Sequence, residues 1–232
     1  MKILITGSSG FVGSKLVEKL SQENEIVSFD LENGKSIMDF EQLKDSMVGC
    51  DAVVHLAAIK GPDESKKFED YFELNNVGTL NVAKACLETG VKKLIYASST
   101  GYYGVEIGIP YQKPIKENNL IITQHLKTDD MKCRDCDVSY STSKVIAEQI
   151  LANYGLRKKF QVIILRFGPM GDKTGAKWNL DGVTLKVENA VQAIEKAINN
   201  KEDLWYETFT ITDKVDGVDI SKAEKLLNYQ PE

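Results

Sequence analysis

The sequence has little of several features that mark specialised classes of protein. It holds 4 cysteines in 232 residues, too few for a disulfide scaffold, so a reducing, cytoplasmic location is expected. It shows no apolar run long enough to cross a bilayer. Met1 leads directly into a short apolar run rather than into the pattern of a signal peptide. We therefore expect no contact with a membrane.

Positive charge is also scarce. The chain has 29 Lys and Arg against 34 Asp and Glu, and its net charge is −5. Without a basic cluster, nucleic acid is not an expected partner. The content of 42% hydrophobic and 27% charged residues is ordinary for a globular protein. The length suits one large α/β domain with a small appendage.

What the sequence does have is three glycines directly after its first apolar run. Ile3–Ile5 is typical of a strand buried on both faces, and Gly7, Gly10 and Gly13 lead into a helical pattern at Ser14–Leu20. Backbone N–H groups and the helix dipole at such a junction suit a pyrophosphate. A side chain at Gly7 or Gly10 would hold the phosphate away, and Gly13 lets the helix pack closely. The spacing predicts a dinucleotide site, with an ordinary turn as the alternative.

An acid ends the second expected strand, Glu25–Asp30. An acid at this place accepts hydrogen bonds from the adenosine ribose of a dinucleotide and would repel the extra phosphate of NADP. The first cation after Asp30 is Lys35. The pattern therefore favours NAD, and the alternative is an acid that caps a turn.

Apolar runs and helical patterns alternate along the chain, which predicts a Rossmann-type, doubly wound parallel α/β sheet. Further strands are expected at Asp51–Ala58, Lys92–Ala97, Phe160–Arg166 and Leu204–Ile211, and helices at Phe40–Val48, Lys67–Glu88, Val138–Tyr154, Val187–Ile198 and Ile220–Leu227. His55, inside the third strand, is expected to be buried and structural. We expect an NAD-binding domain at 1–171. A reduced substrate lobe is expected at 172–232, with some elements returning to the first domain.

Residues 101–137 show an irregular pattern, and a loop of this length is usually functional or mobile. Cys133 and Cys136 lie inside it, and His125 is a third candidate ligand. Because no second cysteine pair accompanies them, neither a closed zinc site nor a redox motif is favoured. No metal is expected.

Side chains suited to proton transfer lie at the fourth strand and the helix after the irregular segment. Ser98, Ser99 and Thr100 end that strand, at the edge where open α/β sheets bind ligands. Tyr140 and Lys144 are four residues apart, on one face of the expected helix. A free tyrosine has a pKa of about 10, and a nearby ammonium group favours its phenolate form. Taken alone, this pair would be an ordinary helix-surface pair.

Four stretches in order resemble the extended short-chain dehydrogenases/reductases, and most closely their NAD-dependent epimerase/dehydratase branch. They are Thr6–Gly13, His55–Ala58, Ser98-Ser99 before Tyr103-Gly104, and Tyr140–Lys144. The resemblance spans most of the chain and is more specific for fold and cofactor than for substrate. It implies NAD as cofactor and an oxidoreductase acting on a sugar or nucleotide sugar.

The resemblance also implies roles for individual residues. Tyr140 is the implied acid/base, Lys144 supports its phenolate and holds the nicotinamide ribose, and Ser99 orients the substrate oxygen. The implied NAD contacts are Gly7, Gly10, Phe11, Val12, Gly13, Asp30, Leu31, Ile37, Leu56, Ala57, Ala58, Lys60, Asn75, Tyr140, Lys144 and Phe167; the implied substrate contacts are Ser99, Thr100, Tyr140 and Gly168.

The chain departs from the family pattern in three places. Ser36 stands where an aspartate is common, Gly168 stands where an asparagine is common, and only 172–186 separates the cofactor half from the next helix. We expect fewer contacts to adenine and diphosphate, and a small substrate lobe. Two alternatives stay open: a sugar or uronate dehydrogenase that releases NADH, and a non-catalytic NAD-binding or sensing protein. A homodimer is compatible with the sequence.

Overall fold

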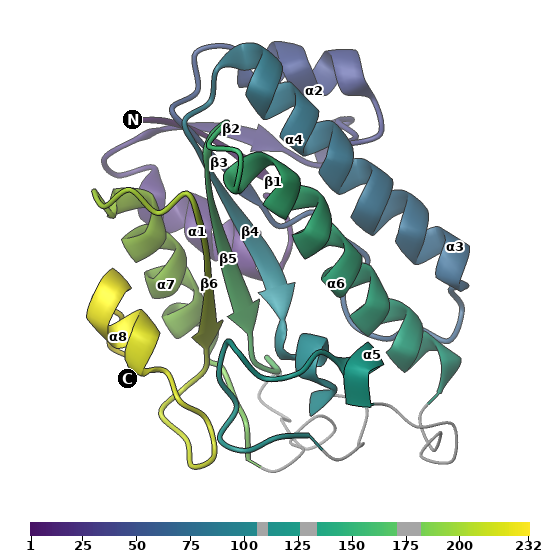
Figure 1. The fold of residues 1–232 in the computed structure, drawn as a ribbon. Helices are drawn as coiled ribbons and strands as arrows, with labels where there is room; N and C mark the ends of the chain where they lie inside the picture. The colour runs from purple at the N-terminus through teal and green to yellow at the C-terminus, as the bar shows by residue number, and fades with distance from the viewer. Residues whose placement is uncertain (106–110, 126–133, 171–181) are drawn as a thin grey trace.

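The computed structural model describes residues 1–105, 111–125, 134–170 and 182–232 (Figure 1). Its centre is a six-stranded sheet in the order β2-β1-β3-β4-β5-β6. All neighbouring strands are parallel, which confirms the predicted sheet. The strands are β1 (Lys2–Thr6), β2 (Glu25–Phe29), β3 (Ala52–His55), β4 (Lys93–Ser99), β5 (Gln161–Phe167) and β6 (Tyr206–Ile211).

Helices cover both faces of this sheet (Figure 1). One face carries α1 (Phe11–Leu20), α7 (Val187–Asn199) and α8 (Ser221–Leu227), and the other carries α2 (Phe40–Met47), α4 (Gly78–Thr89) and α6 (Asp135–Gly155). Shorter elements are η1 (Leu31–Asn33), α3 (Phe68–Tyr71), the π-helical turn η2 (Phe72–Val77), η3 (Thr100–Tyr103) and α5 (Ile122–His125). The fold is therefore a three-layer sandwich with one apolar core on each face of the sheet.

The strands are apolar because each contributes side chains to both cores. Ile3 and Ile5 of β1 pack against α1 and α7, whereas Leu4 between them packs towards α2 and α4. In β3, Val54 belongs to the core on the side of α1 and α7, and Val53 belongs to the core on the side of α2 and α4. Each fully buried side chain of this size contributes about 1.5–3 kcal/mol. Successive side chains of a strand point to opposite faces of the sheet, and helices cover both faces. This explains why the sequences of these strands are continuous apolar runs.

The order of the strands fixes where a ligand can bind. From β1 the chain crosses one face of the sheet to β2, and then returns over the other face to β3, on the far side of β1. The connections therefore diverge between the carboxyl ends of β1 and β3. Open parallel sheets bind their ligands in the crevice at such a point.

The structure differs from the sequence-based prediction in the bounds or the division of several elements. The single helix predicted at Lys67–Glu88 is divided into α3, the π-helical η2 and α4. The third strand ends at His55 rather than Ala58. Helix α6 starts earlier, at Asp135, because the Asp137 carboxylate accepts the backbone N–H of Arg134 at 2.9 Å. The described part of the segment predicted as irregular also contains η3 and α5.

The inner face of α6 carries charged side chains as well as apolar ones. Lys144 and Glu148 are buried, at 4% and 0% exposure. Buried charges are tolerated only when they are paired, and the partners of both lie on the sheet, out of reach of a local sequence pattern.

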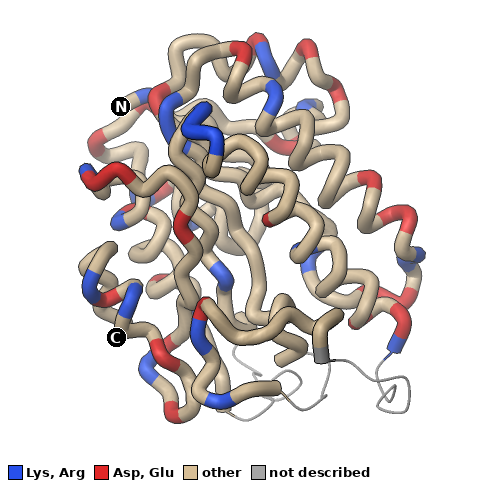
Figure 2. Tube along the Cα trace, viewed as in Figure 1, with Lys and Arg blue, Asp and Glu red and all other residues tan. Residues whose placement is uncertain are grey.

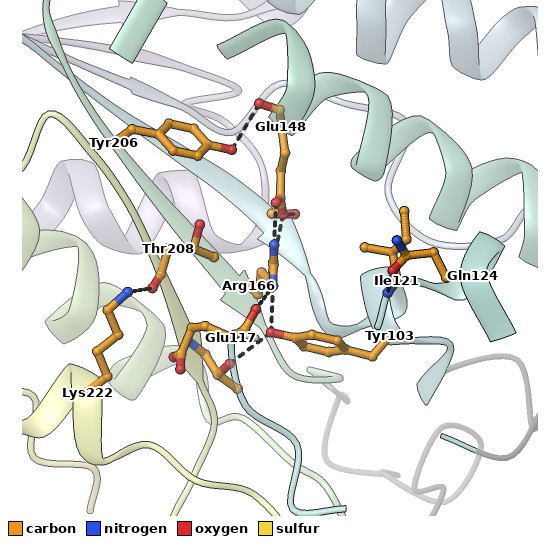
Figure 3. Close-up of polar contacts among 11 residues, drawn as sticks. Tyr103, Glu117, Ile121, Gln124, Glu148, Arg166, Tyr206, Thr208 and Lys222 are labelled. Carbon is orange, nitrogen blue, oxygen red and sulfur yellow. Dashed lines mark hydrogen bonds and ion pairs between the residues drawn. The ribbon is translucent and has the colours of Figure 1, made fainter. Parts of the chain in front are cut away.

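Arg166 of β5 is the partner of Glu148 (Figure 3). The guanidinium donates to both carboxylate oxygens, at 3.0 Å from Nε and 2.7 Å from Nη2. Ser98 of β4 donates its hydroxyl to the same carboxylate. These bonds fasten the middle of α6 to two central strands, β4 and β5.

Further contacts complete the surroundings of the Arg166 side chain. Its Nη1 donates to the hydroxyl of Tyr103 at 2.7 Å and to the carbonyl of Glu117 at 3.1 Å. Its guanidinium carbon lies 3.3 Å from the centre of the Tyr102 ring. Burial opposes the charge, but the adjacent Glu148 carboxylate outweighs it and raises the pKa of Arg166. The pair is therefore charged and held on several sides.

Most other charged residues lie outside the sheet. Figure 2 shows lysine and arginine interspersed with aspartate and glutamate in that view, with the central strands largely uncharged. Across the described ranges, every helix is too short or too polar to cross a bilayer. The predicted domain division at 171/172 lies outside the described residues and stays a prediction. Within 182–232, β6 extends the sheet and α7 packs on it.

Removing one member of the buried pair should destabilise the fold strongly. Glu148→Ala leaves the Arg166 charge buried without its carboxylate, and we expect a loss of about 3–5 kcal/mol in the free energy of unfolding. The matched control is Glu224→Ala, which breaks a surface pair with Lys214 at 3.9 Å and should cost less than about 1 kcal/mol. Urea unfolding at neutral pH measures both. Equal effects of the two substitutions would contradict the anchoring role of the pair.

Candidate functional site

A cleft of about 920 Å³ runs along the carboxyl edge of the sheet. The ends of β1, β2, β3, β4 and β5 all contribute to it. The predicted site residues that line it are Gly7, Gly10, Phe11, Val12, Gly13, Asp30, Leu31, Ile37, Leu56, Ala57, Ala58, Lys60, Ser99, Tyr140, Lys144, Phe167 and Gly168. The fold thus brings most of the predicted residues into one continuous site.

Two predicted site residues are placed elsewhere. Thr100 is buried in η3 and is not part of the lining. Asn75 is also buried, and its side-chain oxygen accepts the backbone N–H of Ile59 at 2.8 Å. Its amide nitrogen donates to the hydroxyl of Ser143 at 2.9 Å. Asn75 therefore lies behind the lining residue Ile59 and holds it in place, and does not itself line the cleft.

The prediction also missed part of the lining. The additional residues are Ser9, Phe29, Glu32, Lys35, Ser36, Ile59, Gly61, Pro62, Asp63, Leu74, Ala97, Ser98, Pro169 and Met170. Several directly follow predicted residues at a strand end. The turn signal Gly61-Pro62-Asp63 after the third strand was available in the sequence, and these three residues line the cleft.

The glycine loop is shaped by two close approaches of backbone. Gly7 has φ +71°, and a Cβ there would lie 2.7 Å from the nitrogen of Ala57. A Cβ on Gly13 would lie 2.1 Å from the carbonyl oxygen of Gly7. The first glycine therefore lets the segment after β3 close on the segment after β1, and the last lets α1 pack onto the loop.

The start of α1 has the features of an anion site. The helix begins at Phe11, and its N-cap residue is Gly10, which has no side chain to satisfy the first N–H groups. Ser8 is 5% exposed, and its hydroxyl has no hydrogen-bond partner among the described residues. A pyrophosphate supplies the acceptors that such a loop and helix terminus require. The residues present therefore fit a dinucleotide.

Asp30 braces the same loop from the end of β2. One carboxylate oxygen accepts the backbone N–H of Ser9 at 3.0 Å, and the other accepts that of Glu32 at 3.0 Å. The acid thus caps η1, as the turn-capping alternative described, and also lines the cleft. Carboxylate oxygens can accept more than one hydrogen bond each, so the geometry leaves acceptor capacity for ribose hydroxyls.

His55 is buried, as predicted, and connects three segments behind the cleft. Thr79 donates its hydroxyl to the Asn75 carbonyl, so it accepts a hydrogen bond from Nε2 of His55 at 3.0 Å. Nδ1 then accepts the hydroxyl of Thr6 at 2.8 Å, and the Thr6 oxygen accepts the backbone N–H of Ala57 at 3.2 Å. Burial first, and the Lys144 charge second, lower the pKa of His55 to about 3. The ring is neutral at pH 7.

Tyr140 and Lys144 lie one turn apart on α6, facing the ends of β4 and β5. The Lys144 amine donates to the carbonyl of Ala97 at 2.9 Å and lies 5.8 Å from the centre of the Tyr140 ring. Ser99 accepts the backbone N–H of Gly101 at 3.0 Å, which orients its hydroxyl group. A phenol, an ammonium group and a serine hydroxyl thus gather at the end of the cleft opposite Asp30.

The cysteine region is described in part. Cys133 lies outside the described residues, and so does the side chain of His125. Cys136 is buried, as are Cys50 and Cys86. In the portions of the chain that are placed, no three His, Cys, Asp or Glu side chains gather as metal ligands would.

Comparisons with known proteins agree with this geometry. A model described as the NAD dependent epimerase/dehydratase family matches residues 3–175. UDP-glucose 4-epimerase of Vibrio cholerae is 30% identical over 192 residues, covering 72% of this chain and 52% of that protein. The same enzyme of Neisseria meningitidis serogroup C is 29% identical over 198 residues, covering 73% and 53%. The chain spans about half the length of the curated relatives it matches.

Solved structures show the same fold. UDP-glucuronic acid 4-epimerase from Bacillus cereus in complex with NAD has a TM-score of 0.79 at 21% identity, covering 100% of this chain and 94% of that chain. A mutated uronate dehydrogenase has a TM-score of 0.72 at 19% identity, covering 100% and 81%. At these identities the likeness concerns the fold.

The burial of His55 predicts how the free energy of unfolding depends on pH. The pKa of His55 is about 3 in the folded protein against 6.5 for an unperturbed histidine. Between these two pH values only the unfolded chain takes up the proton. Stability should therefore fall as pH decreases, by about 1.4 kcal/mol per pH unit, or about 2 kcal/mol between pH 7.5 and 5. Urea unfolding of wild type and His55→Gln at both pH values measures this. A wild-type loss no larger than that of the variant would contradict it.

Proposed function

The chain belongs to the NAD dependent epimerase/dehydratase family, and on that premise we propose that it acts on a sugar or nucleotide sugar by reversible hydride transfer, as an epimerase or dehydratase. NAD is the cofactor of this family, which confirms the cofactor predicted from the sequence. The observation that carries the proposal is the shared cleft, in which the glycine loop and Asp30 lie at one end and Tyr140 and Lys144 at the other.

The residues of the cleft divide between holding the cofactor and handling protons. The glycine loop and the start of α1 would hold the pyrophosphate, and Asp30 the adenosine ribose. Lys144, beside the end of β4, would hold the nicotinamide ribose. When bound, NAD supplies the acceptor and donor of hydride at C4 of its nicotinamide. The chain itself must therefore remove and return the hydroxyl proton of the substrate.

We assign that proton transfer to Tyr140. A nearby ammonium favours the phenolate form of a tyrosine, and the Lys144 amine is buried next to the Tyr140 ring. Ser99, oriented by the backbone N–H of Gly101, would hold the substrate oxygen towards the phenol. Gly168 borders the same end of the cleft. The four residues provide positioning and one proton-transfer group.

A sugar or nucleotide sugar is the proposed substrate class because the relatives with matching sequence are named UDP-glucose 4-epimerase. A second candidate is a sugar or uronate dehydrogenase with net release of NADH. It is favoured by the short connection between β5 and α7, residues 168–186, which leaves little chain to enclose a nucleotide. The two candidates differ in whether NADH accumulates during turnover.

The cofactor end of the proposal is tested at Asp30. We expect tighter binding of NAD than of NADP, because the carboxylate repels the extra phosphate. Asp30→Ala should weaken NAD binding by roughly 1.5–3 kcal/mol, the value of one charge-assisted hydrogen bond. Calorimetric titration of both cofactors measures this, with Glu25→Ala at the opposite, exposed end of β2 as the matched control. Tighter binding of NADP would overturn the assignment.

The catalytic end is tested at Tyr140. A screen of sugars and nucleotide sugars with NAD, read by NADH absorbance and by NMR of the sugar, should find turnover. Tyr140→Phe keeps the ring and removes the proton-transfer group, so turnover should fall roughly 10²–10⁴-fold with little change in NAD affinity. Tyr154→Phe, on the same helix with its ring stacked on Phe160, is the control.

Each outcome of this screen supports or contradicts one of the candidate functions. Isomerised sugar without NADH supports the epimerase, and accumulation of NADH with oxidised sugar supports the dehydrogenase. NAD binding without any turnover supports a non-catalytic NAD-binding protein and overturns the proposed reaction. Near-normal turnover of Tyr140→Phe removes Tyr140 from the mechanism.

A further inference from the structure

The segment 59–63, which we name the cleft wall, is fastened by the hydroxyl of Tyr71. All five of its residues line the cleft. The Tyr71 oxygen accepts the backbone N–H of Asp63 at 2.8 Å and donates to the carbonyl of Gly61 at 3.1 Å. Burial raises the pKa of Tyr71, so the phenol keeps the proton that it donates. One side chain thus closes the outer end of the cleft wall.

The inner end of the cleft wall is held from the same helical segment. Asn75, four residues after Tyr71, accepts the backbone N–H of Ile59 at 2.8 Å. The π-helical turn η2 begins directly after Tyr71 and contains Asn75. Both side chains are buried, at 0% and 1% exposure. Two residues on one short stretch of helix therefore hold both ends of the wall.

That stretch of helix also contacts the proposed acid/base. The ring of Tyr71 meets the ring of Tyr140 edge-on, with centroids 6.3 Å apart and an interplanar angle of 64°. Such an edge contact is a favourable geometry for two aromatic rings. On the other side, Asn75 donates to Ser143, whose hydroxyl donates to the Tyr140 carbonyl at 2.7 Å. The stretch of helix that carries Tyr71 and Asn75 therefore supports both the ring and the backbone of Tyr140.

We propose that Tyr71 is a positioning residue, which holds the cleft wall for the cofactor through its hydroxyl and orients the Tyr140 phenol through its ring. Neither role needs Tyr71 in the lining, where it does not lie. The two roles use different atoms, so they can be separated by substitution. The second role rests on the proposed function of Tyr140; the first does not.

Tyr71→Phe removes both hydrogen bonds to the wall and keeps the ring. We expect the affinity for NAD to fall roughly threefold to tenfold, the effect of losing about one net hydrogen bond. Hydrogen exchange of the Asp63 amide should speed up in the same variant, since this N–H loses its acceptor. The turnover number at saturating NAD should stay near the wild-type value.

Tyr71→Leu removes the ring as well. It should weaken NAD binding as much as Tyr71→Phe does, and in addition lower the turnover number severalfold, because the Tyr140 ring loses its edge contact. The matched control is Tyr206→Phe, which removes a hydrogen bond from a tyrosine to the backbone of α6, at 3.2 Å, without touching the wall. A merely structural role would make Tyr71→Phe and Tyr206→Phe alike: both less stable, and both with unchanged NAD affinity and wall exchange.

Unchanged NAD affinity and unchanged exchange of the Asp63 amide in Tyr71→Phe would overturn the role of the hydroxyl. Equal turnover numbers of Tyr71→Leu and Tyr71→Phe would overturn the role of the ring. If wild-type protein turns over no substrate, the proposed function fails, and exchange and NAD affinity still decide the role of the hydroxyl. The two failures are therefore distinguishable.

Discussion

The buried ion pair of Arg166 and Glu148 is the interaction on which the site depends. It fastens α6 to β5, one turn beyond Lys144 and two turns beyond Tyr140, and the Ser98 hydroxyl adds a bond from β4 to the same carboxylate. A long helix that is attached only by apolar contacts has many nearly equivalent positions against a sheet. A helix that is also attached by a two-point ion pair has one such position. The end of the cleft that contains Tyr140 and Lys144 is thus positioned by an ion pair whose two residues do not line the cleft.

The cofactor end depends on backbone packing instead. Gly7 allows the segments after β1 and β3 to touch, and the neutral His55 ring with Thr6 holds the second of them in place. Asp30 adds the support of β2. One end of the cleft is therefore formed by closely packed backbone, and the other end by side chains of the anchored helix α6. The cleft wall at 59–63 connects these two ends.

The sequence predicted what depends on local pattern and missed what depends on tertiary contact. The parallel sheet, the glycine loop and the spacing of Tyr140 and Lys144 are visible as apolar runs and residue spacings. Glu148 was not identified, because a glutamate in a helix usually faces solvent and its partner is on a distant strand. Asn75 was among the implied cofactor contacts; in the structure it holds the backbone of Ile59 from behind the cleft, an arrangement that residue spacing alone does not specify.

The π-helical turn has a consequence for how this sequence tolerates insertion and deletion. A π turn contains one residue more than the α-helical turn it replaces. Deleting one residue within Phe72–Val77 would therefore restore a regular α-helical turn and leave Tyr71 in nearly the same rotation relative to α4. The side chains within the turn would instead shift around the helix axis, and Asn75 is one of them. A single-residue deletion would thus keep the architecture and the direction of Tyr71 while it moves the residue that holds Ile59.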